Sequence, residues 1–396
     1  MLSRTTALLI AAAFATVGCA HPHEEVSIAP LAPAASKVDP GLGPGTRALS
    51  SGPGYKGSPS WSPEGDRIAF TIDGYVVDKP AGSEDLRRWT TRDFVAEDTE
   101  WISDDTLTML GAAPGSKTPS EETSSSVYRA RAGKNSLGLE KVANGVLAMT
   151  PDREGLICAL ENRAYESGLM LTDDSGEVYR LYTTPIQGHV TALSPSPDGD
   201  QVVLAVRPPG DLETSELRVF DLRKGKGLEI TRLHGNQEIL GTPQWTEQGI
   251  YFVAGKKNTP MDADGSEPLY FLYRVPAEGG APEPAPGVGE DFVAASIRVS
   301  PDGEQLAVIG RLNPQAPPNL YVLDLVAKDL KAVTTNEDME IKTGPDDLAW
   351  SPGGRSVAIV ARGTPSTEPE VRAEPADRLL RDFYNLYEVP VGGTPQ

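Results

Sequence analysis

Seven segments of the chain share one pattern of apolar and polar positions. In each, an apolar residue, often Trp, is followed by a turn of the Ser-Pro-acid-Gly type and then by a strand rich in Val, Ile and Ala. The spacing between copies, 40 to 54 residues, is typical of a unit of four short strands with insertions in its loops. The copies begin at Trp61, Trp101, Met149, Pro195, Trp245, Val299 and Trp350.

The repeated turn has residue types that suit a tight β-hairpin. In Ser62-Pro63-Glu64-Gly65, proline presets φ, the acid can hydrogen-bond its own backbone, and glycine accepts the positive φ that closes the turn. Further strand-like runs follow each turn, and 40 Gly with 35 Pro indicate many such turns. The pattern predicts an all-β fold, a seven-bladed β-propeller over residues 46–396, with six or eight blades as the alternatives.

The last copy has no room for a fourth strand, because its third strand ends near the C-terminus. Residues 46–50, which precede the first copy, have the character of an outer strand. We expect this N-terminal outer strand to lie beside the last strand and close the ring, which removes exposed sheet edges.

The copies resemble the repeats of TolB and its relatives, whose signature runs close to Pro-x-Trp-Ser-Pro-Asp-Gly-x-x-Ile-Ala-Phe. Residues 59–70 match it almost throughout, and the resemblance extends from about residue 46 to the C-terminus. It implies a TolB-like, WD-repeat-like β-propeller. TolB itself has an N-terminal α/β domain and six blades, and neither is seen in this sequence. The repeat implies little about function, because binding modules, enzyme appendages and a few lyases all carry it.

The N-terminus has the features of a secretion signal followed by a lipid-attachment site. A basic start precedes an apolar stretch over residues 7–17, which is signal-peptide length. Thr16-Val17-Gly18-Cys19 resembles the bacterial lipobox, with Thr16 in place of the usual Leu; an ordinary cleavage site beside a cysteine is the alternative. We expect residues 1–18 to be removed and Cys19 to carry acyl chains such as palmitate, which hold the protein at a membrane.

Residues 19–45 are rich in Pro and Ala and show no hydrophobic period. They predict a disordered tether that holds the body roughly 25–30 Å from its anchor, given coil-like statistics. The expected location is the cell envelope, on the periplasmic side of the outer membrane.

The net charge of −20 argues against nucleic acid as a partner, since a phosphate backbone would repel it. The same charge favours a cationic ligand or a basic envelope protein, bound by a monomer.

Catalytic signatures are sparse. The chain has no Gly-x-Ser-x-Gly nucleophile elbow, so a hydrolase of the prolyl-oligopeptidase kind is excluded. Neither a cofactor nor a metal is expected. The alternative function is a metal-assisted, lyase-like carbohydrate-active enzyme that uses His189, His234 and nearby acids. Cys158 lies in an apolar run and is expected to be a small buried hydrophobe.

Acidic residues gather in the loops that lead into the inner strands. In a propeller these loops share a face with those between second and third strands, which here include the longest insertions, and function usually resides in such loops. We therefore expect a noncatalytic envelope lipoprotein that binds a protein or small ligand at this face. The candidate ligand-binding residues are Glu100, His189, His234, Glu238, Asp291, Asp346 and Asp347.

Overall fold

The computed structural model describes residues 42–83, 85–90, 94–112, 125–131, 138–153, 155–163, 166–210, 214–233, 237–256, 269–336, 339–363 and 383–392. Strands and turns make up this part of the chain, with no helix in it. None of the described residues therefore belongs to a helix long and apolar enough to cross a membrane. The expected signal peptide, Cys19 and His234 lie outside the described residues.

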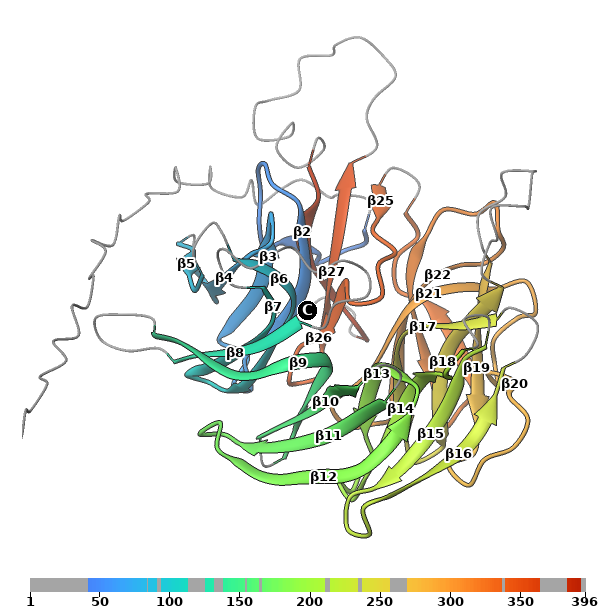
Figure 1. Cartoon of the computed structure of the whole chain (residues 1–396). Helices are drawn as coiled ribbons and strands as arrows, with labels where there is room; N and C mark the ends of the chain where they lie inside the picture. Colours follow the sequence, from blue (N-terminus) through green and yellow to red (C-terminus); the bar gives the residue numbers. More distant parts are fainter. Residues whose placement is uncertain are drawn as a thin grey trace, which may run out of the picture.

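The described strands form six antiparallel sheets that follow one another in chain order around a common centre (Figure 1). Four of the sheets contain four strands each, in simple up-and-down order. Their strands are β2 (Lys56–Trp61), β3 (Arg67–Ile72), β4 (Tyr75–Pro80) and β5 (Arg87–Arg88); β13 (His189–Pro195), β14 (Gln201–Arg207), β15 (Glu216–Asp221) and β16 (Lys226–Arg232); β17 (Gln237–Thr246), β18 (Gly249–Lys256), β19 (Tyr270–Val275) and β20 (Glu283–Pro284); β21 (Val293–Val299), β22 (Gln305–Arg311), β23 (Asn319–Asp324) and β24 (Asp329–Ala332).

One sheet contains seven strands because a single long strand belongs to two hairpin systems. The strand β9 pairs with β8 from Gly138 to Val146 and with β10 from Val146 to Asp152. It is therefore the outer strand of one group of four and the inner strand of the next. The sheet comprises β6 (Val95–Ser103), β7 (Thr106–Ala112), β8 (Ser125–Arg131), β9 (Gly138–Asp152), β10 (Gly155–Arg163), β11 (Glu166–Asp173) and β12 (Val178–Gln187).

The last sheet joins the two ends of the described chain. It comprises β25 (Met339–Ile341), β26 (Leu348–Trp350), β27 (Ser356–Gly363), β28 (Asn385–Pro390) and the N-terminal β1 (Arg47–Ala48). Arg47 lies opposite Glu388 and Ala48 opposite Tyr387, and the backbone N–H of Leu49 donates to the carbonyl of Leu386 at 2.8 Å. The prediction that residues 46–50 lie beside the last strand is confirmed. The strand β2 also contacts β26 and β28, so the first and last sheets are neighbours.

The repeated turn has the predicted geometry. In the copy at Ser196, the N–H of Gly199 donates to the Ser196 carbonyl at 2.9 Å, and Gly199 has a φ of +76°. The Ser196 hydroxyl in turn donates to the Asp198 carboxylate at 2.6 Å. The serine, the acid and the glycine of the motif are therefore explained by turn formation.

The repeated tryptophans tie neighbouring sheets together. The indole N–H of Trp101 donates to the Ser60 carbonyl at 3.1 Å, and that of Trp350 donates to the Arg298 carbonyl at 2.8 Å. Both side chains are buried. Their role is packing between sheets, as the repeat position suggested. Cys158 is also fully buried, and burial raises the pKa of its thiol to about 12, which leaves it unreactive.

Candidate binding site in the central channel

The inner strands enclose a cavity of about 760 Å³. Residues of the Ser-Pro-Asp-Gly turns, among them Ser196 and Asp302, also line it, so the cavity reaches the face that carries those turns. A single cavity shared by so many separate strands is the central channel. The inner strands contribute Ser60 from β2, Glu100 from β6, Thr150 from β9, Ser194 from β13, Gln244 from β17, Arg298 from β21 and Ala349 from β26.

A loop over residues 342–347 crosses this channel. It lies between β25 and β26, which both pair with β27, so it bulges out of a single interrupted strand. The Pro345 carbonyl accepts a hydrogen bond from the Ser296 hydroxyl of β21 at 2.8 Å. A Cβ added to Gly241 of β17 would lie 2.7 Å from the Pro345 Cβ, and Gly241 has a φ of +66°. Glycine at 241 therefore makes room for this segment, which we name the channel loop.

The channel loop brings Asp346 to the side chains of two other sheets. Asp346 interacts electrostatically with Asp98 and Glu100 of β6 and with Arg298 of β21. Arg298 Nη2 lies 3.9 Å from Glu100 Oε1, and the Ser60 hydroxyl donates to Glu100 Oε2 at 3.1 Å. Three carboxylates thus share one guanidinium. We name Asp98, Glu100 and Asp346 the channel acids.

The three channel acids can together carry more negative charge than the single guanidinium of Arg298 offsets. Burial, together with the charges of Asp346 and Glu100, raises the pKa of the Asp98 carboxyl well above its ordinary value. Burial also raises the pKa of Glu100, against the opposing effect of Arg298. A carboxyl whose pKa is raised by like charges is one whose charged form an added cation would stabilise. The arrangement therefore favours a cationic group in the channel.

Asp347 has a different role from its neighbour. The Lys342 ammonium lies 2.9 Å from Asp347 Oδ1, donates to the Lys56 carbonyl at 3.2 Å, and sits 4.2 Å from the centre of the Tyr55 ring. Asp347 is thereby neutralised, and Lys342 attaches the base of the channel loop to β2. We assign this pair to holding the loop in place.

The remaining predicted residues are not part of the channel group. The Tyr270 hydroxyl donates a hydrogen bond to Glu238 Oε1 at 2.6 Å, so this carboxylate already has a partner within its own sheet. His189 lies opposite Arg207, and burial, with a smaller contribution from Arg207, lowers its pKa and favours the neutral ring. Asp291 is exposed in the turn before β21, and His234 lies outside the described residues. Of the seven candidates, the structure brings Glu100 and Asp346 together, with Asp347 adjacent in the loop.

Arg298 was missed at the sequence level although a signal existed. It occupies the position just before the apolar residue that begins its copy, as Glu100 does, and this position lines the channel in most copies. A charged residue at that repeat position can therefore be predicted to lie in the channel wall. Among the described residues, no group of three or more His, Cys, Asp or Glu side chains has a geometry that could hold a metal ion.

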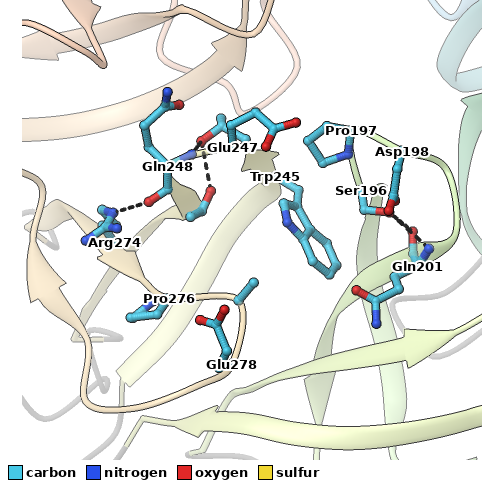
Figure 2. Close-up of a pocket in the computed structure, with 13 residues that line it drawn as sticks. Ser196, Pro197, Asp198, Gln201, Trp245, Glu247, Gln248, Arg274, Pro276 and Glu278 are labelled. Carbon is cyan, nitrogen blue, oxygen red and sulfur yellow. Dashed lines mark hydrogen bonds between the residues drawn. The ribbon is translucent and has the colours of Figure 1, made fainter.

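A second, smaller pocket of about 320 Å³ lies between the turns of two neighbouring sheets (Figure 2). Trp245 stands between the Ser196 turn on one side and Arg274 on the other, and Arg274 Nε donates to the Gln248 carbonyl at 2.6 Å. The hydrogen bonds drawn there lie within each of the two sheets, between Ser196 and Gln201 on one side and between Arg274 and Gln248 on the other. This pocket is accounted for by packing of the repeats.

Replacing Asp98 by Asn should change how stability depends on pH. Because the pKa of Asp98 is raised in the folded state, that state binds more protons than the unfolded chain, and stability falls as pH rises through the window above about pH 4. An Asn side chain does not titrate, so the variant does not lose stability in this way as pH rises. We expect the variant to unfold at a higher temperature than the parent at neutral pH, with little difference at about pH 4. Calorimetry at both pH values measures this, and a gain of the same size at both would contradict the assigned cause.

No family model matches the chain, and no curated protein matches it. Among solved structures, a chain in the crystal structure of the mitotic checkpoint complex aligns with 89% of this chain and 95% of its own length, with a TM-score of 0.53 and 14% identity. The putative TolB from Agrobacterium tumefaciens covers 86% of this chain and 92% of its own, with a TM-score of 0.40 and 14% identity. TolB from Acinetobacter baumannii covers 85% and 79%, with a TM-score of 0.42 and 14% identity. The fold is all-β, with antiparallel sheets arranged around a common centre as a β-propeller, as the sequence predicted.

Proposed function

We propose that this protein is a noncatalytic envelope lipoprotein that binds a cationic group of a protein or small ligand at the channel acids and the loops around them. The observation that carries the proposal is the sharing of one guanidinium, that of Arg298, by three carboxylates. The excess of negative charge is unfavourable in the protein alone, and a lysine, arginine or amine of a partner would offset it.

We propose seven blades for the propeller. The support comes from β9, which divides the seven-stranded sheet into two groups of four that share it. With the other five sheets this makes seven units, the number of copies of the repeated turn. The channel is then surrounded by seven inner strands, of which the one formed by β25 and β26 is interrupted by the channel loop.

The rest of the proposal rests on the N-terminal sequence. Acylation of Cys19 would place the body at a membrane, with the periplasmic side of the outer membrane as the proposed location. A basic partner in the envelope then meets the channel acids at high local concentration. A monomer suffices for this role, and nucleic acid is not a partner at a net charge of −20.

Capture of partners from solubilised envelope tests the proposal. The protein with Asp98→Asn, Glu100→Gln and Asp346→Asn should lose at least about tenfold of the capture that the parent shows, because the changes remove the carboxyl groups that an added cation would contact. The matched control is Glu64→Gln, Glu283→Gln and Glu304→Gln, which removes the same number of carboxyl groups from exposed positions. The control should capture as the parent does. Equal capture by all three proteins would overturn the proposed site.

A further inference from the structure

Packing of the repeats accounts for the walls of the second pocket, but not for the charged side chains that these walls leave unpaired (Figure 2). One wall is the turn between β13 and β14, and the other comprises the turn between β17 and β18 with the end of β19 and the residues after it. The N–H of Gly280 donates to the Ile230 carbonyl of β16 at 3.0 Å, which holds the second wall against the neighbouring sheet. The pocket volume of about 320 Å³ suits a small molecule.

Arg274 places a guanidinium in this pocket without a carboxylate partner. Its Nε donates to the Gln248 carbonyl at 2.6 Å, and among the described residues its side chain makes no other hydrogen bond and no ion pair. Glu283 lies directly opposite in β20, but the bond to Gln248 holds the guanidinium at the turn instead. A Cβ added to Gly249, which has a φ of +131°, would lie 3.0 Å from Arg274 Nε, so glycine makes room for this side chain. The two terminal nitrogens are left to receive a carboxylate.

Two exposed carboxylates of the lining are also unpaired. Figure 2 shows Glu247 and Glu278 on different sides of the indole, each apart from Arg274. Neither carboxylate has an ion pair or a hydrogen bond among the residues that the structure describes. The third acid of the lining, Asp198, already accepts a hydrogen bond from the Ser196 hydroxyl at 2.6 Å. The pocket therefore leaves one positive and two negative charges for a ligand to match.

Trp245 supplies an apolar wall between these charges. Its side chain is 7% exposed and lines the pocket together with Pro276. The indole N–H groups of Trp101 and Trp350 bond to the preceding inner strand, whereas Trp245 makes no such bond within the described part of the chain. A short methylene chain that carries charged ends packs well against a surface of this kind.

We propose that this pocket binds a free basic amino acid such as lysine. The Arg274 guanidinium binds the carboxylate of the ligand, Glu278 and Glu247 bind its two ammonium groups, and its methylene chain lies along Trp245. Each free charge of the pocket then has a partner of opposite sign. A simple anion is disfavoured by the two acids, and a diamine leaves the guanidinium unmatched. None of the channel acids lines this pocket, so the inference stands whether or not they bind a cation.

Three ligands that differ by one charged group test the inference on the full mature chain. They are L-lysine, L-norleucine, which lacks the side-chain ammonium, and cadaverine, which lacks the carboxylate. Titration calorimetry should show lysine binding at least about tenfold tighter than either of the others, since each missing group leaves one charge of the pocket without a partner. The same preference should persist in the protein with Asp98→Asn, Glu100→Gln and Asp346→Asn, which separates this pocket from the channel acids.

Variants locate the contact. Arg274→Met should lower the affinity for lysine to that for cadaverine, because the carboxylate then has no partner. Glu278→Gln changes an exposed side chain and should weaken the binding of lysine and cadaverine alike. Arg355→Met removes the same charge as Arg274→Met from an exposed turn position and should bind lysine as the parent does.

Four results would each overturn the proposal. They are equal affinities for the three ligands, absence of lysine binding at millimolar concentration, equal effects of Arg274→Met and Arg355→Met, and loss of lysine binding when the channel acids are replaced. The last result would assign the ligand to the channel.

Discussion

Removal of the N-terminal strand should lower the unfolding temperature of the body by about 10 °C. The comparison is between a chain that begins at Asp39 and one that begins at Ser51. The shorter chain loses Leu42 and Leu49, which are both buried, and the pairing of β1 with β28. Loss of a buried leucine side chain typically costs about 2–5 kcal/mol, and about 1 kcal/mol shifts the midpoint of a protein this large by roughly 2 °C.

The expected loss of stability comes from apolar contacts that Leu42 and Leu49 make in two different core clusters, one on each side of the ring closure. Leu42 packs in the cluster that contains Ile309 and Tyr387, and Leu49 packs in the one that contains Phe70 and Leu386. A control variant, Arg47→Ala, removes a side chain that is 57% exposed, and it should lower the midpoint only slightly because exposed ion pairs contribute little. Scanning calorimetry measures all three proteins. Equal midpoints for the two truncations would show that β1 does not hold the ring closed.

Replacing Cys19 by Ser should move the protein from the membrane fraction to the soluble fraction almost completely. Two or three acyl chains on one cysteine anchor a protein stably, because each buried CH₂ contributes about 0.8 kcal/mol, and serine accepts none of them. The unfolding temperature of the body should not change, since the described body begins well after this residue. Fractionation and intact mass spectrometry give the answer together. A parent protein without acyl mass, or a variant that still sediments with membranes, would contradict the lipoprotein assignment.

The repeats were predictable because their turns and packing positions are encoded locally. Ser196, Asp198 and Gly199 form the turn by themselves, so the motif marks the hairpin wherever it occurs. Trp101 and Trp350 recur at one position, where each packs between sheets and bonds to the preceding inner strand. The N-terminal strand was also predictable, since the last copy lacked a fourth strand and residues 46–50 could supply it.

The site was less predictable because it depends on how distant segments meet. Asp346 could be identified as an acid near an inner strand, but its place beside Asp98 follows from the channel loop, which Gly241 and Ser296 position from other sheets. No local pattern encodes such a crossing. Asp291 has the same sequence context as Asp346, an acid shortly before an inner strand, yet it stays in an exposed turn. Proximity to an inner strand was therefore a necessary signal but not a sufficient one.

The shared strand β9 also escaped the sequence pattern. Its first half completes one group of four strands and its second half begins the next, with no turn between them. The motif at Met149 marks the start of a copy correctly. However, the motif describes only the hairpin that follows it, so it cannot show whether the preceding outer strand ends before the copy begins.

Titration of the purified body with a tri-arginine peptide at low salt tests the central claim most directly. The account predicts binding that weakens as salt rises, because the interaction is between charges. It also predicts affinity at least about tenfold lower for the protein with Asp98→Asn, Glu100→Gln and Asp346→Asn, and unchanged for the control with Glu64→Gln, Glu283→Gln and Glu304→Gln. The two variants each lack three carboxyl groups, so the position of the removed acids distinguishes them. Equal affinities of the two variants would contradict the claim that the channel acids form a cation-binding site.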